Sequence, residues 1–168
     1  MTIATPDSGG TRAAKVEDVA TQVALARAIA TVAHRSQKDK VGAAYISHPA
    51  RVASRFDPIL QPLEHCVAWL HDVIEDTGTT AADLRSAGIQ AGIVDAVVLL
   101  TRSEEVASED YYCRIAAHPS ARAVKLADID DNADPERTRL LDDETRTRLA
   151  RKYADARQLL APAGGDPA

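Results

Sequence analysis

The run HDVIED at residues 71–76 gathers one imidazole and three carboxylates into six consecutive positions. Burying such a cluster is costly unless a cation neutralises it. On a continuous helix, which turns by about 100° per residue, His71, Asp72, Glu75 and Asp76 would fall within an arc of roughly 140°. A divalent metal ion is the simplest occupant of the place to which that arc points. The run therefore indicates a metal-dependent hydrolase.

The helix that carries this run is predicted to extend from Pro62 to Glu75 and to be apolar on its opposite face. The apolar positions are Leu63, Cys66, Val67, Leu70, Val73 and Ile74. A helix with one apolar and one acidic face packs its apolar face on the core and turns the other toward a site. Cys66 lies on the apolar face, which predicts a core thiol.

Two other segments offer further metal ligands. His48 and Pro49 open a predicted short helix, since proline is well tolerated in a helix's first turn. Asp128 lies in VKLADIDDN among residues suited to burial, and Lys125 and Asn132 share its helix face. Two imidazoles and two carboxylates form a mixed nitrogen and oxygen site. Such a site suits Mn²⁺ or a similar divalent transition metal better than Mg²⁺, and zinc is less favoured without thiolates.

The rest of the chain predicts an all-α fold, a single helical bundle around this metal site. Apolar spacing and helix-start signals predict a first helix from Val19 to about Gln37, a short helix in ARVASRF, a helix begun by a Thr80 and Asp83 capping box, and helices at 89–100, 111–117, 121–132 and 143–160. No alternation typical of a strand is found. Residues 1–14 and 161–168 carry Pro and Gly without apolar periodicity and are predicted to be mobile tails around a domain at 15–160.

Composition narrows the classes of partner. A chain of 168 residues that is 45% hydrophobic and 27% charged suits one globular domain. Its net charge of −5 argues against DNA or RNA as a partner, but is compatible with a small phosphorylated ligand in a local basic pocket. No apolar stretch approaches the roughly 20 residues of a membrane span. Two cysteines without a signal peptide predict a cytoplasmic protein. The oligomeric state is not predicted.

Four motifs together resemble a known family. AHRSQ, KVGAAYISHP, WLHDVIEDT and VKLADIDDN, in this order and spacing, are similar to the HD-domain phosphohydrolase superfamily. Within it they resemble the hydrolase domain of RelA/SpoT enzymes and the small alarmone hydrolases, over about Val19 to Arg137. A His-Asp pair alone would be a weak signal, whereas the ordered set is a strong one.

The resemblance implies metal ligands at His48, His71, Asp72 and Asp128, with Glu75 and Asp76 acting on the attacking water. It implies hydrolysis of a nucleotide 3'-pyrophosphate, as when guanosine 3',5'-bis(diphosphate), or (p)ppGpp, yields a guanosine diphosphate and pyrophosphate. In such a mechanism Lys38, Lys40 and Lys125 would offset the phosphate charge. Asn132 would hydrogen-bond the sugar or the base.

The chain departs from the family at several positions. Asp39 and Lys40 stand where the family usually has an Arg-Lys pair, and Ala44 replaces a proline. An acid at Asp39 is expected to repel a polyphosphate, although Lys38 and Arg35 lie close enough in sequence to substitute. After KLAD, Ile129, Asp131 and Ala133 replace the arginine, histidine and methionine that the family tends to carry.

Two alternative functions remain open. One is an HD phosphohydrolase that acts on another nucleotide, and the other is a non-catalytic nucleotide-binding or antitoxin-like module. The intact Glu75 and Asp76 pair argues against the second, because binding alone does not require both acids.

The remaining histidines and the loop tyrosine have simpler interpretations. His34 is expected to pack a helix and at most to support the loop. His65 and His118 are expected at the surface without partners. Tyr45 packs under the loop or stacks on a base, and packing is favoured.

Overall fold

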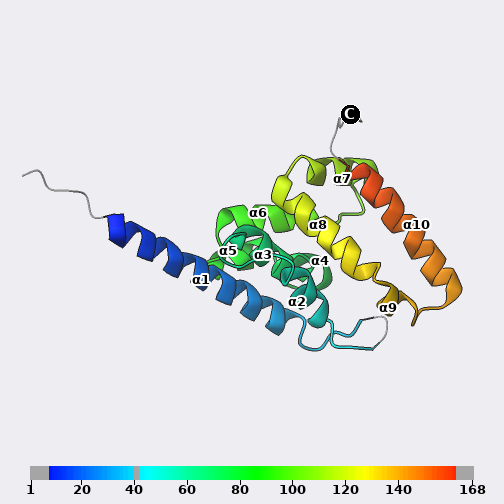
Figure 1. The fold of residues 1–168 in the computed structure, drawn as a ribbon, viewed down its shortest axis with the longest axis horizontal. Coiled ribbons are helices and arrows are strands. Elements are labelled where there is room, and N and C mark those ends of the chain that lie inside the picture. Colours follow the sequence, from blue (N-terminus) through cyan, green and yellow to red (C-terminus); the bar gives the residue numbers. More distant parts are fainter. Residues whose placement is uncertain (1–7, 40–41, 162–168) are drawn as a thin grey trace, which may run out of the picture.

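The structure is a computed structural model that describes residues 8–39 and 42–161, with only the backbone described for residues 8–16. Its helices are α1 (Ser8–Ala33), α2 (Ser47–Ala53), α3 (Pro62–Leu70), α4 (Val73–Asp76), α5 (Ala81–Ser86), α6 (Ala91–Leu100), α7 (Ser108–Ala116), α8 (Pro119–Asn132), α9 (Pro135–Thr138) and α10 (Asp143–Leu159) (Figure 1). The described residues form no strand, and Lys38 and Ala44 pair in an isolated bridge. The predicted all-α class is therefore confirmed. None of the described helices has the length and apolar character needed to cross a membrane.

Helix α3 is the centre of the bundle and packs against α1, α2, α6 and α8 (Figure 1). Its residues Cys66, Val67, Ala68 and Leu70 are fully buried. A helix that is apolar on most of its circumference is stable only when other helices cover it. Cys66 is a buried core thiol, as predicted, and burial raises its pKa to about 11.

Several helix starts follow the sequence signals. Thr80 Oγ1 accepts a hydrogen bond from Asp83 N at 3.1 Å, and Asp83 Oδ2 accepts one from Thr80 N at 2.8 Å. These two bonds are the predicted capping box. The predicted proline in the first turn of α2 is Pro49. Helix α9 was not predicted, and it begins at Pro135 with Asp134 Oδ1 accepting from Glu136 N at 2.8 Å.

The first helix begins and ends earlier than predicted, at Ser8 and Ala33 rather than at Val19 and Gln37. Its N-terminal half projects beyond the other helices (Figure 1). Residues 1–7 and 162–168 of the predicted tails lie outside the described residues. The mobility of 1–14 and 161–168 stays a prediction.

The predicted continuous helix from Pro62 to Glu75 is wrong, because the chain leaves the helix at His71 and Asp72. Helix α3 ends at Leu70 and α4 begins at Val73. The backbone of Asp72, at φ −101° and ψ −4°, lies in the sparsely populated bridge region where many active-site residues are found. Consecutive side chains on an ideal helix diverge by about 100°. The break lets His71 and Asp72 approach the same point instead.

Candidate metal centre

Four predicted ligands converge from three parts of the chain: α2, the break between α3 and α4, and α8. One ligand atom each from His48, His71 and Asp72 lies within 4.8 Å of the others. His71 Nε2 is 3.0 Å from Asp72 Oδ2 and 3.2 Å from His48 Nε2. Asp128 Oδ1 lies 3.2 Å from His48 Nε2 and 3.8 Å from His71 Nε2. The structure thus brings together all four residues.

The hydrogen bonds of the two rings show which nitrogen each histidine offers. His71 Nδ1 donates to the carbonyl oxygen of Ala68 at 2.7 Å, and His48 Nδ1 donates to Asp131 Oδ2 at 2.7 Å. Each neutral ring therefore has its lone pair on Nε2. Two lone pairs and two carboxylates that face one another fit a divalent cation, since mixed imidazole and carboxylate donors are those that transition metals take in proteins.

Electrostatics also favours a cation at this point. Burial alone would raise the pKa of the Asp72 carboxyl, but the adjacent His71 lowers it to about 2. Burial opposes ionisation of Asp128 as well, yet Lys125 holds the pKa of Asp128 well below its usual range. The pKa values of His48 and His71 are raised despite burial, because carboxylates contact both rings. The cluster therefore carries negative charge that protons or a metal ion would neutralise.

The Nδ1 side of the His48 ring is held by Asp131, which is in turn bound by Arg51. Arg51 binds both oxygens of Asp131, Nε to Oδ1 at 2.7 Å and Nη2 to Oδ2 at 2.9 Å. Asp131 is 3% exposed. Neither Arg51 nor Asp131 was among the predicted site residues. Arg51 lies three residues after His48 in α2, and Asp131 lies three after Asp128 in α8, so helical spacing places each beside a ligand.

Asp72 is held by Tyr45, whose hydroxyl donates to Asp72 Oδ2 at 2.5 Å. Burial and the Asp72 charge raise the pKa of Tyr45, which keeps this donor protonated. The Tyr45 ring packs on the buried ring of His34, with centroids 4.9 Å apart, and meets His48 edge-on. His34 is therefore a packing residue, as expected, and the Tyr45 ring packs on it.

Gln37 joins the end of α1 to the acidic segment. Its Oε1 accepts from His34 Nδ1 at 2.5 Å, and its Nε2 donates to the backbone oxygen of Asp76 at 2.6 Å. Its backbone oxygen accepts from Tyr45 N at 3.0 Å. A single residue thus connects α1, the loop before α2 and α4.

Asp128 is held by its two predicted companions on α8. Lys125 Nζ is 2.9 Å from Asp128 Oδ2, and Asn132 Nδ2 donates to Asp128 Oδ1 at 2.6 Å. Burial would lower the pKa of Lys125, but the Asp128 charge raises it, so the ammonium stays charged. Both side chains also line the cavity described next.

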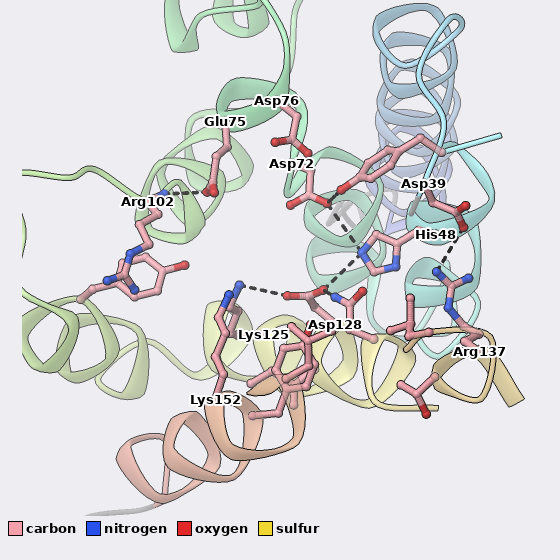
Figure 2. Close-up of a pocket in the computed structure, with 18 of the residues that line it drawn as sticks. Asp39, His48, Asp72, Glu75, Asp76, Arg102, Lys125, Asp128, Arg137 and Lys152 are labelled. Carbon is pink, nitrogen blue, oxygen red and sulfur yellow. Dashed lines mark hydrogen bonds and ion pairs between the residues drawn. The ribbon is translucent and has the colours of Figure 1, made fainter. Parts of the chain in front are cut away.

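The metal centre forms the floor of a cavity of about 450 Å³. We call the candidate metal centre the floor: His48, Asp72 and Asp128 line the cavity, whereas His71 contacts His48 and Asp72 and does not line it. The rim, as named here, consists of Lys38, Asp39, Glu75, Asp76, Arg102 and Arg137, all of which line the cavity. Figure 2 shows Glu75 and Asp76 at the top of the view near Asp72, and Lys125 and Lys152 lower in the view near Asp128. Tyr111, Tyr112, Tyr153, Leu141 and Leu149 supply aromatic and apolar walls.

Glu75 and Asp76 are exposed at the rim. Glu75 Oε2 accepts a hydrogen bond from the backbone nitrogen of Arg102 at 2.7 Å. The two acids therefore reach the cavity from α4 even though the predicted continuous helix is broken. Lys38 is exposed at the rim, and Lys40 lies outside the described residues.

No family model matches the chain. Among solved structures, the chain is similar to a metazoan orthologue of SpoT that is described as hydrolysing ppGpp and playing a role in starvation responses. The identity is 19%, the TM-score is 0.67, and the match covers 95% of this chain and 89% of that chain. This chain has the HD-domain fold. The resemblance predicted from the four motifs is confirmed at the level of fold.

Within this HD-domain fold, the departure at Asp39 is accompanied by a second charged residue. Arg137 Nη2, from α9, is 3.4 Å from Asp39 Oδ2. Arg137 Nε is also 3.9 Å from Asp131 Oδ2. The acid that was expected to repel a polyphosphate is therefore paired with a cation at the rim.

Two histidines outside the centre were expected to lack partners, and that expectation is wrong. His65 Nδ1 is 2.9 Å from the carbonyl oxygen of Phe56, and His65 Nε2 accepts from Trp69 Nε1 at 3.1 Å. His118 precedes α8 and its Nδ1 accepts from Ala121 N at 3.2 Å, which caps the helix. Both side chains are half-buried, because these bonds hold them against the fold.

Proposed function

We propose that this protein is a metal-dependent phosphohydrolase that releases pyrophosphate from guanosine 3',5'-bis(diphosphate). The observation that carries the proposal is the convergence of His48, His71, Asp72 and Asp128 at the floor of a cavity whose rim presents two further acids and several cations. A binding site for an apolar ligand would not gather these charges. A phosphate ester needs both a cation at its oxygens and a group that handles protons.

The floor residues would hold Mn²⁺ or a similar divalent ion, His48 and His71 through Nε2 and Asp72 and Asp128 through carboxylate oxygens. A bound ion of this kind lowers the pKa of water and polarises a phosphate oxygen. Asp131 and the carbonyl of Ala68 fix the ring tautomers, so each ring presents the nitrogen that ligates.

Glu75 and Asp76 would handle the protons of the reaction. One carboxylate accepts the proton of the attacking water as the water oxygen bonds to the phosphorus of the 3'-pyrophosphate. The bond from that phosphorus to the 3'-oxygen breaks. The 3'-oxygen is the leaving group, and it takes up a proton from one of the two acids. The Glu75 carboxylate accepts from the Arg102 backbone, and the backbone oxygen of Asp76 accepts from Gln37, so two bonds tie α4 to neighbouring segments.

The cations around the cavity would offset charge on the substrate phosphates. Lys38 stands at the rim and Lys125 beside Asp128, while Lys40 is proposed from the sequence alone. Asn132 would keep its bond to Asp128 and offer its remaining amide atoms to the sugar or base. The metazoan protein of the same fold, which is described as hydrolysing ppGpp, supports this choice of substrate.

A nucleotide screen tests the proposal. Purified protein is incubated with guanosine 3',5'-bis(diphosphate) and other nucleotides in the presence of Mn²⁺, Mg²⁺ or Co²⁺, and pyrophosphate and orthophosphate are measured separately. Pyrophosphate release that needs Mn²⁺ is expected, and it should be absent in Asp72→Asn. Orthophosphate release from another nucleotide would instead favour a different HD phosphohydrolase. Tight binding without turnover of any substrate would favour the non-catalytic module.

A further inference from the structure

Two arginines contact Asp131 in different ways. Arg51 binds both Asp131 oxygens at 2.7 and 2.9 Å and does not line the cavity. Arg137 approaches Asp131 only to 3.9 Å and Asp39 to 3.4 Å, and it does line the cavity. Close bidentate pairs are the strong ones, and single contacts at these distances are weak. Arg51 is therefore held firmly by Asp131, whereas Arg137 is held only weakly.

The guanidinium of Arg137 keeps donors for another acceptor. Arginine has five N–H groups in a planar fork that matches phosphate oxygens. Asp39 meets the guanidinium through Nη2 at 3.4 Å and Asp131 through Nε at 3.9 Å. The side chain is 26% exposed. An anionic group in the cavity could thus bind Arg137 without unfolding any part of the site.

Asp39, in contrast, is fixed in its turn. Its Oδ1 accepts from Ala43 N at 2.9 Å, and its backbone oxygen accepts from Gly42 N at 3.0 Å. Gly42 has φ +85°, a conformation that suits glycine and tightens the turn. The Asp39 side chain is therefore held by its own turn as well as by Arg137. Arg137 is the member of the pair that is able to change partner.

We propose that Arg137 is a ligand-binding residue that exchanges Asp39 for a phosphate group of the substrate and so determines which nucleotides the cavity accepts. The inference rests on the proposed function for the identity of that nucleotide. Figure 2 shows Arg137 and Asp39 on one side of the metal centre and Arg102 on the other. The ligand class that fits is a nucleotide with anionic groups at two separate positions, one of which meets Arg137.

Equilibrium binding and kinetics of guanosine 3',5'-bis(diphosphate) test the exchange. Arg137→Ala should raise the Michaelis constant about tenfold with turnover nearly unchanged, because a charge-assisted bond made in both ground and transition states contributes uniform binding. Arg137→Lys should fall between wild type and Arg137→Ala, since the charge remains and the fork is lost. Arg139→Ala is the matched control, because Arg139 is on the surface beside α9, pairs with Glu136 and does not line the cavity. Melting temperatures check that each variant folds.

A second comparison separates ligand binding from simple neutralisation of Asp39. Asp39→Asn keeps the side-chain oxygen that accepts from Ala43 but removes the charge. If Arg137 contacts the ligand, the double variant Asp39→Asn with Arg137→Ala should bind several-fold more weakly than Asp39→Asn alone. Equal affinity of these two variants would overturn the inference, because Arg137 would then serve only to neutralise Asp39.

The inference and the proposed function can fail separately. Binding is measured by calorimetry in the Glu75→Gln background with Mn²⁺, so that it does not depend on turnover. Hydrolysis by wild type with no effect of Arg137→Ala overturns the inference and leaves the function standing. Arg137-dependent binding without hydrolysis by wild type overturns the function alone. Absence of measurable binding in every variant overturns the inference.

Discussion

The floor and the rim of the cavity differ in how far their charged side chains are buried and paired. His71, His48 and Asp128 at the floor are 2%, 3% and 6% exposed, and each has a further polar atom bound by the protein. At the rim, Glu75, Asp76, Arg102 and Lys38 are exposed. Buried charges must be paired to be tolerated, whereas exposed charges are tolerated without partners. The floor therefore has the buried, paired polar groups that a metal site needs, whereas most of the rim side chains face solvent.

The largest effect on metal content and turnover is expected for Asp72→Asn at the floor. The substitution removes the charge that faces both histidines, so metal content should fall below one-tenth of wild type and turnover by on the order of 10³-fold. Metal analysis of the purified protein and steady-state kinetics measure both. Asp95→Asn, which removes an exposed acid paired with Arg85, is the control. If the Asp72→Asn protein retained its metal, the assignment of metal binding to the floor residues would be contradicted.

Substitution of the rim acids should separate chemistry from metal binding. Glu75→Gln or Asp76→Asn is expected to lower turnover by on the order of 10²-fold and to leave metal content at the wild-type level. Glu104→Gln, an exposed acid that does not line the cavity, should have no effect. If neither rim variant changes the rate on the best substrate, the assignment of these acids to proton transfer is wrong.

Asp131→Asn should weaken the floor without removing a ligand. The charge that holds His48 Nδ1 and Arg51 is lost, and metal affinity should decrease by about 10- to 100-fold. Competition with a chelator measures the affinity. Asp130→Asn offers a matched control one residue away, because Asp130 pairs with Arg55 and Arg157 at the surface. Equal effects of the two variants would contradict a specific role of Asp131.

The smallest expected effect is that of Lys38→Ala at the rim. An exposed charge contributes little, so the Michaelis constant should rise about threefold with turnover and metal content unchanged. Arg85→Ala, an exposed cation away from the cavity, provides the baseline. A loss of metal in Lys38→Ala would show that the rim also supports the floor.

The helices and the convergence of the four floor residues could be predicted from the sequence. Helical periodicity placed the apolar residues of α3 in the core, and Thr80 and Asp83 marked the start of α5. The motifs around His48, HDVIED and Asp128 named the residues that the structure brings together. Such signals are local, and they survive in the folded chain because packing reinforces them.

The break at His71 and Asp72 could not be predicted in the same way. Val73 is buried and Ile74 packs against the core, so the apolar pattern continues past the break and periodicity registers no change. The conformation of Asp72 is set by tertiary contacts, including the bond from Tyr45.

The pairing of Asp39 with Arg137 could not be predicted from the sequence either. These residues are far apart in the chain, and a contact between them depends on how α9 lies against the loop before α2. Charge type alone suggested that Asp39 would repel a phosphate. Its effect is set by a neighbour that no local pattern reveals.

The bridge made by Gln37 has a consequence for motion at the site. Helix α4 has four residues, far fewer than an isolated helix needs to persist in water. Its order therefore depends on tethers from outside, and the bond from Gln37 to the Asp76 carbonyl ties it to the much longer α1. Segments held by few contacts open at a lower free energy than the core. Opening of α4, which carries both acids, is thus opposed by a side chain just beyond the end of α1 that carries no charge.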